Sequence, residues 1–75
     1  MGKPSTLKIH NNLSGLRKAK NITQEELATA VGVTRATMNY VENSTYLPSL
    51  ELAFKLGMFF KMRIEDIFYC EGENS

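Results

Sequence analysis

Cysteine, histidine and long apolar runs are scarce in this sequence. One cysteine, Cys70, excludes a disulfide within the chain, and with the one histidine it gives too few ligands for a zinc site. No apolar run approaches the roughly 20 residues of a membrane-spanning helix, and the first residues form no apolar signal segment. We therefore expect a cytoplasmic protein without a metal, a cofactor or a membrane partner.

Residue combinations typical of enzymes are also missing. The sequence has no Ser/His/Asp set, no pair of carboxylates suited to a cleft and no glycine-rich loop that would hold a phosphate. We therefore expect neither enzymatic activity nor a small-molecule substrate.

The chain is short, so the lack of disulfides and metal ligands has a consequence. Its 75 residues make one domain, and the core of such a domain is marginal unless a disulfide, a metal or a partner subunit adds to it. A second subunit is the remaining option. We expect a flexible lead over residues 1–7, a folded domain over residues 8–70 and a frayed acidic tail over residues 71–75.

Net charge is low but unevenly distributed. The formal net charge is +1 at pH 7, yet the first 40 residues hold six Lys/Arg and two Glu, whereas residues 41–75 hold three Lys/Arg and six acids. A basic half and an acidic half suit a protein that presents one side to an anion such as nucleic acid. Ordinary scatter in a short chain is the alternative explanation.

Apolar periodicity predicts mainly helices. Helices are expected from residue 11 or 12 to 20, from 23 or 24 to 30 or 31, and over residues 34–42, 49–60 and 64–67. Alternating or strand-like runs occupy residues 7–10 and 68–70, which can pair into a small two-stranded antiparallel sheet. The expected fold class is all-α with five helices and this possible sheet.

Residues 23–42 carry the clearest start and stop signals. Thr23 and Glu26 have the spacing of a capping box, and Gly32 offers the left-handed conformation that a sharp helix exit requires. Ala28 lies four residues after Gln24 and is small enough to let a second helix cross closely. Two helices joined by a short turn that contains glycine are the geometry of a helix-turn-helix motif.

The third expected helix has an apolar face and a polar face. Met38 and Val41 fall on one side of a helical wheel and would be buried. The opposite side carries Arg35, Ala36, Asn39, Tyr40 and Asn43. Because Arg, Asn and Tyr side chains bond base edges and phosphates, this face is the candidate DNA-reading surface.

The pattern resembles the phage-repressor/Cro family of helix-turn-helix regulators, also called the XRE family. Residues 23–28, 31–35, 41–43, 47–53 and 64–68 carry the resemblance, which spans residues 11–70. The short length and the two strand-like ends are most similar to the cytolysin-repressor-like subgroup, whose members are homodimers with a small added sheet. The resemblance implies a lambda-repressor-like fold and a homodimeric transcriptional regulator, in the first place a repressor, that binds an inverted-repeat operator in double-stranded DNA.

The resemblance also implies roles for individual residues. Thr23 and Gln24 would open the second helix against a phosphate, and Arg17 would pair with Glu42 and bring a cation near the DNA backbone. The implied DNA-binding residues are Arg17, Thr23, Gln24, Thr34, Arg35, Ala36, Thr37, Asn39, Tyr40 and Asn43. Of these, the base-facing positions are Arg35, Ala36, Asn39 and Tyr40, and the positions near the backbone are Thr34, Thr37 and Asn43.

The sequence departs from the family pattern at several positions. Ala36 stands where a polar reader is common, so it offers a methyl group suited to the C5-methyl of thymine. Ser44 and Lys61 replace habitual glycines, and Arg63 replaces a capping Ser or Thr. Since Ser44 is not glycine, we expect Asn43 to take the left-handed conformation itself.

An apolar group near the end of the fourth helix predicts a subunit interface. Because Leu56 and Phe60 serve the core face, Phe59 is expected to point away from the core into an exposed patch. The expected dimer interface consists of Met58, Phe59, Met62 and Phe68. The alternative function is an antitoxin-like or anti-repressor module that binds a protein and for which DNA is secondary.

Overall fold

Five helices and one small sheet make up residues 8–71, the part of the chain that the computed structural model describes. In chain order they are β1 (Lys8–Asn11), α1 (Leu13–Ala19), α2 (Gln24–Val31), α3 (Arg35–Glu42), α4 (Leu50–Phe60), α5 (Ile64–Ile67) and β2 (Phe68–Glu71). The expected fold class is confirmed, with small shifts in the element bounds. The expected lead over residues 1–7, including Leu7 of the expected strand, and residues 72–75 of the expected tail lie outside the described residues.

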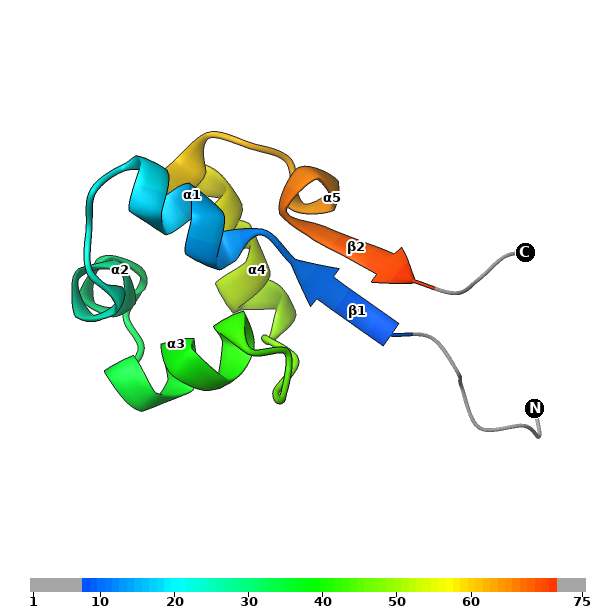
Figure 1. Cartoon of the computed structure of the whole chain (residues 1–75), viewed down its shortest axis with the longest axis horizontal. Coiled ribbons are helices and arrows are strands. Elements are labelled where there is room, and N and C mark those ends of the chain that lie inside the picture. Colours follow the sequence, from blue (N-terminus) through cyan, green and yellow to red (C-terminus); the bar gives the residue numbers. More distant parts are fainter. Residues whose placement is uncertain (1–7, 72–75) are drawn as a thin grey trace.

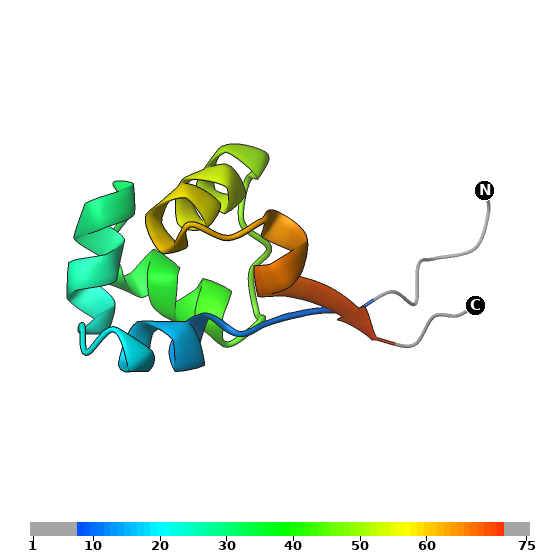
Figure 2. The same ribbon diagram turned by 90° about the horizontal axis from the view of Figure 1, so that it is seen from above.

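The helices surround one core, and the sheet projects from it. In Figures 1 and 2, α1 and α3 lie on one side of α4, α2 closes one end of the helical body, and the two strands extend from the opposite end. This arrangement leaves α2 and α3 at the surface, away from the outer end of the sheet.

Each helix contributes to the core. Leu13, Leu27, Met38, Leu56 and Ile67 come from five different helices and are all fully buried. The other members of the core cluster are Ala28, Val31, Val41, Leu52 and Phe60. Burial of each large apolar side chain stabilises the fold by about 1.5–3 kcal/mol, so the core fixes the positions of all five helices together.

Side chains cap three of the helices as their sequences predict. The Thr23 hydroxyl accepts from the backbone N–H of Glu26 at 3.0 Å, and the Glu26 carboxylate accepts from the N–H of Thr23 at 2.8 Å, which completes the capping box. Thr34 and Ser49 cap α3 and α4 in the same way through their hydroxyls. Such caps are each worth about 1 kcal/mol. Gly32 ends α2 with a φ of 79°, as expected.

The two strands join the ends of the described chain. They pair antiparallel with Lys8 opposite Glu71 and Asn11 opposite Phe68. The side chain of Asn11 also reaches out of the sheet, because its Nδ2 donates to the carbonyl of Val41 at 2.9 Å and its Oδ1 accepts from the N–H of Leu13 at 3.0 Å. Asn11 therefore fastens the sheet to the last turn of α3.

The left-handed residue after α3 is Ser44, so the expectation for Asn43 is wrong. Asn43 has a φ of −85° and Ser44 a φ of 62°. The N–H of Asn43 still donates to the carbonyl of Asn39 at 3.0 Å, which continues the helical pattern for one more residue. The chain reverses at Ser44, after which the N–H of Thr45 donates to the carbonyl of Tyr40 at 3.0 Å.

Lys61 takes the left-handed conformation at the end of α4, with a φ of 57° and a ψ of 45°. This conformation is unfavourable for a residue with a Cβ, whereas glycine adopts it freely but loses more entropy on folding. We expect Lys61→Gly to raise the free energy of unfolding by about 0.5–1 kcal/mol in urea titrations, the difference between these two effects. Lys18→Gly is the matched control, because Lys18 is an exposed residue inside α1, where glycine should lower the free energy of unfolding. A loss of stability in Lys61→Gly would contradict this interpretation.

Candidate nucleic-acid interface

Helices α2 and α3 cross next to each other, joined by a turn of residues 32–34. The turn is sharp because Gly32 is left-handed and the N–H of Val33 donates back to the carbonyl of Ala28 at 3.0 Å. Ala28 is buried, so its small side chain permits the close crossing that the sequence predicted. The first residue of α2 thereby lies beside the outer face of α3.

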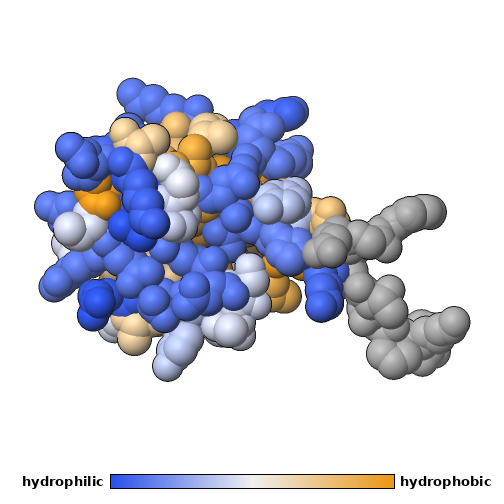
Figure 3. All heavy atoms as spheres, viewed as in Figure 1, coloured by the Kyte–Doolittle hydropathy of each residue, from blue (hydrophilic) through white to orange (hydrophobic). Residues whose placement is uncertain are grey.

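That outer face holds the residues expected to read bases. Side chains from α2 and α3 line a shallow hollow of about 330 Å³, namely Gln24, Arg35, Ala36, Asn39 and Tyr40. The four α3 residues are exposed and Gln24 is half-buried. Figure 3 shows that the side of the molecule bearing α1 and α3 is mainly hydrophilic. The structure thus brings the expected base-facing residues together on one polar surface.

Thr34 and Thr37 form the first turn of α3 at the edge of this surface. The Thr34 hydroxyl accepts from the N–H of Thr37 at 3.1 Å and donates to the Thr37 hydroxyl at 3.0 Å. Thr34 is exposed and Thr37 is half-buried. The Thr37 hydroxyl therefore keeps its own hydrogen for an acceptor such as a phosphate oxygen.

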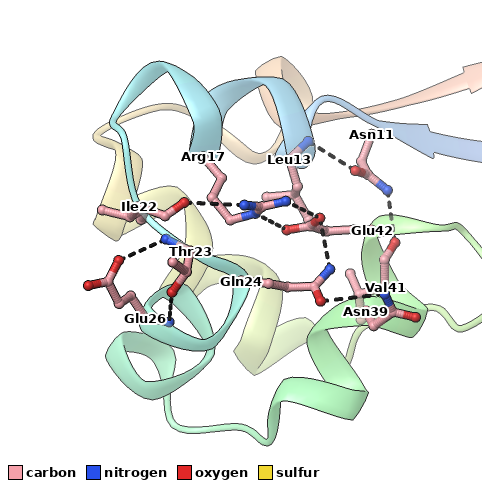
Figure 4. Close-up of polar contacts among 10 residues, drawn as sticks. All are labelled: Asn11, Leu13, Arg17, Ile22, Thr23, Gln24, Glu26, Asn39, Val41 and Glu42. Atoms are coloured by element: carbon pink, nitrogen blue, oxygen red, sulfur yellow. Dashed lines mark hydrogen bonds and ion pairs between the residues drawn. The ribbon is translucent and has the colours of Figure 1, made fainter.

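The expected ion pair between Arg17 and Glu42 is present. Arg17 donates from Nε to Oε2 of Glu42 at 2.9 Å and from Nη2 to Oε1 at 3.2 Å, and its Nη1 donates to the carbonyl of Ile22 at 3.2 Å (Figure 4). The two side chains are only 13% and 4% exposed. Arg17 therefore lies behind the polar surface, with its charge largely balanced by Glu42.

The sequence did not predict a chain of hydrogen bonds that starts at Glu42. Gln24 Nε2 donates to Glu42 Oε1 at 3.1 Å, Asn39 Nδ2 donates to Gln24 Oε1 at 3.4 Å, and Asn43 Nδ2 donates to Asn39 Oδ1 at 3.2 Å. Figure 4 shows the first two of these bonds between α2 and α3. The spacing of Asn39 and Asn43, one helical turn apart, was the one sequence signal for it. The candidate site is thus a connected set of side chains.

Exposed apolar side chains gather on α4. Phe54 is 55% exposed and Met58 71% exposed. Both line a groove of about 590 Å³ between α4 and α5, together with Met62 and Ile64. Arg63 also lines this groove, and its Nε donates to Asp66 at 3.3 Å. This hydrogen bond and the charge of Asp66 raise the pKa of Arg63. We refer to the surface formed by Phe54, Met58, Met62 and Ile64 as the α4–α5 groove.

Phe59 does not point away from the core, so that expectation is wrong. It is half-buried and packs against the core cluster, with its ring edge-on to Phe60 at a centroid distance of 5.0 Å. The ammonium of Lys20, after α1, lies 5.9 Å from the centre of the Phe59 ring. The segment that follows α1 therefore covers part of this face of α4. A helical wheel drawn for α4 alone predicts that the same face is exposed. Phe68 is also half-buried and packs against the core from β2.

Residues 8–71 contain neither a cluster of metal-binding side chains nor a membrane-spanning helix. No group of three or more His, Cys, Asp or Glu side chains in this part of the chain is placed to hold a metal ion. The longest described helix, α4, has 11 residues, and none of the described helices is long and apolar enough to span a membrane.

Comparison with known proteins agrees with this geometry. Residues 13–67 match the family model described as Helix-turn-helix. An HTH-type transcriptional regulator of Methanocaldococcus jannaschii is 48% identical over 65 residues, which cover 87% of this chain and 98% of the relative. The HTH-type transcriptional regulator YgzD of Bacillus subtilis is 44% identical over 66 residues, 88% of this chain and 100% of the relative. The family match extends from the first residue of α1 to the last residue of α5.

Proposed function

The chain belongs to the helix-turn-helix family and is a DNA-binding transcriptional regulator, and on that premise we propose that it is a homodimeric repressor that binds an inverted-repeat operator. The observation that carries the proposal is the polar surface of α2 and α3, where Arg35, Asn39 and Tyr40 are exposed beside the first turn of α2. We also propose that the protein belongs to the cytolysin-repressor-like subgroup, because β1 and β2, which flank the five helices, pair into a small sheet.

Helix α3 is the recognition helix in this proposal. An α-helix with its side chains is about 10–12 Å wide, which fits the major groove of about 12 Å. Arg35 is at the start of the helix, where it can bond the O6 and N7 atoms of guanine, and Ala36 beside it offers a methyl group to thymine. Thr23, Thr34, Thr37 and the N-terminus of α2 face the phosphates that flank the groove.

A second copy of the chain completes the proposed unit. In a dimer with twofold symmetry, the two α3 helices enter successive major grooves about 34–36 Å apart, which requires an inverted repeat. The α4–α5 groove supports self-association, because exposed apolar patches mark partner surfaces and the core of so small a domain gains from added burial. A dimer seated on its operator would exclude other proteins from that DNA in the cytoplasm, which is the basis for proposing repression.

The proposal is tested by selecting bound sequences from random duplex DNA at one defined salt concentration, because phosphate contacts make affinity salt-dependent. The wild-type protein should select an inverted repeat. Enrichment of no sequence, or of a single half-site without a repeat, would overturn the proposed function.

Arg35→Ala should reduce affinity for the selected operator by about 1–3 kcal/mol and relax the preference at one base pair in each half-site. The physical reason is the loss of a bidentate contact that only guanine supplies. Binding titrations against operators that vary at that base pair measure both effects. Lys18→Ala is the matched control, since it removes the same charge from the exposed last turn of α1 and should not change the base preference. Equal weakening on all operators would identify Arg35 as a phosphate contact.

A further inference from the structure

Three amide side chains on the polar surface are linked in one direction. Glu42 accepts from Gln24, Gln24 accepts from Asn39, and Asn39 accepts from Asn43, at distances of 3.1, 3.4 and 3.2 Å. The series crosses from α3 to α2 and back to α3, and its outer members are exposed. We call Glu42, Gln24, Asn39 and Asn43 the amide relay.

The buried carboxylate determines the direction of every bond in the amide relay. A carboxylate only accepts hydrogen bonds, so the group that Gln24 turns toward Glu42 must be its NH₂. The oxygen of Gln24 then faces Asn39, which must offer its own NH₂, and the oxygen of Asn39 in turn faces the NH₂ of Asn43. Rotating any one of these amides by half a turn would place two oxygens or two NH₂ groups against each other.

The root of the amide relay is held firmly. Two nitrogens of Arg17 bond the two oxygens of Glu42, at 2.9 and 3.2 Å, and the Glu42 side chain is 4% exposed. Water therefore has little access to replace Gln24 as a partner, and charge-assisted hydrogen bonds are stronger than neutral ones. The orientation is fixed before any ligand binds.

We propose, on the premise that α3 reads DNA, that Glu42 and Gln24 lock the amide of Asn39 in one orientation so that Asn39 reads adenine on one strand only. After its bonds to Gln24 and Asn43, Asn39 keeps one Nδ2 hydrogen and one Oδ1 lone pair. These complement the N7 acceptor and N6 donor of adenine. If the amide rotated by half a turn, its donor and its acceptor would exchange places and no longer match adenine. The locked amide therefore distinguishes A·T from T·A as well as from G·C. Gln24 and Glu42 act as positioning residues in this reading.

The first test uses the free protein and needs no DNA. Gln24→Met removes the first amide of the relay, the one bonded to Glu42, but keeps the side-chain length and a good helix former. In an isotope-labelled protein, the NH₂ resonances of Asn39 should shift in this variant, and their exchange with water should accelerate. Thr29→Met is the matched control, because it places the same side chain on an exposed position of α2 and should leave those resonances unchanged. Unchanged Asn39 resonances in Gln24→Met would overturn the amide relay.

The second test measures base preference. Operators are compared that carry A·T, T·A or G·C at the position whose preference Asn39→Ala abolishes. A bidentate contact discriminates by roughly 5- to 150-fold, so the wild-type preference for A·T should lie in that range and should fall to about twofold or less in Gln24→Met. A preference that stays at the wild-type level while affinity falls equally on all operators would overturn the proposal and leave Gln24 as a phosphate contact. If the wild-type protein shows no sequence preference, the proposed function fails, whereas the resonances of Asn39 still decide whether the amide relay exists.

Discussion

Arg17→Met should destabilise the protein by about 3–5 kcal/mol, because it leaves the buried carboxylate of Glu42 without its charged partner. A single hydrophobic core in a domain of this size rarely supplies more than about 3–5 kcal/mol, so the variant should be close to unfolded at room temperature. Thermal unfolding followed by circular dichroism measures the effect, because each kcal/mol of lost stability lowers the melting temperature of such a domain by about 4–8 °C. The carbonyl of Ile22 also loses a donor in this variant.

The double variant Arg17→Met/Glu42→Leu distinguishes the net contribution of the ion pair to stability from the cost of leaving one buried charge unpaired. Two apolar side chains of similar volume remove both charges, so the double variant should be more stable than Arg17→Met alone. A double-mutant cycle that gives additive losses would contradict the interpretation, because residues in direct contact are expected to couple. The cycle also has a functional readout, since loss of Glu42 removes the acceptor at the root of the amide relay.

Met58→Glu should dissociate the proposed dimer and weaken binding to the inverted repeat by about 10²- to 10⁴-fold, although residue 58 touches no DNA in the proposed complex. The reason is that, once one subunit of a dimer is bound, the second subunit binds its half-site at a high effective concentration. This gain in affinity disappears when the subunits separate. Met58 is 71% exposed, so a carboxylate there should leave the monomer folded. Sedimentation measures the dissociation, under reducing conditions because Cys70 is exposed.

Leu50→Glu is the matched control for this experiment. Leu50 is 72% exposed at the start of α4 and does not line the α4–α5 groove, so the dimer should persist in this variant. A monomeric wild-type protein at tens of micromolar, with full operator binding by Met58→Glu, would refute the dimer. Phe59→Glu is unsuited to this test, because Phe59 packs against the core and a charge there should unfold the monomer.

Local signals in the sequence were sufficient to predict the helices. Capping residues such as Thr23 and Thr34 bond backbone groups only three positions away, and Gly32 is suited by its own lack of a side chain to the left-handed end of a helix. These helix boundaries can therefore be predicted from a few neighbouring residues, without the rest of the chain. The bend after α3 shows the limit of such signals. Asn43 and Ser44 both tolerate a turn, and the hydrogen bonds of the neighbouring residues decide which one becomes left-handed.

Contacts between distant segments were harder to predict. The pairing of Arg17 with Glu42 followed from a resemblance, whereas the partner of Gln24 depends on how closely α2 crosses α3. The same applies to Phe59, which is covered by a connection that lies some forty residues earlier in the chain. The composition of a helix face shows which side chains are apolar, but neighbouring segments determine how much of that face stays exposed.

The pairing of β1 with β2 has a consequence for the order in which the molecule is made. Lys8 and Asn11 pair with Glu71 and Phe68, so the strand that leaves the ribosome first acquires its partner only when nearly all of the described chain has been synthesised. Contacts of such large sequence separation form late in folding, because a long loop must close before they are gained. Asn11 also bonds the carbonyl of Val41 in the last turn of α3. A nascent chain can therefore form α1 to α4 early, but closure of the sheet, which holds Asn11 beside the last turn of α3, must wait for β2.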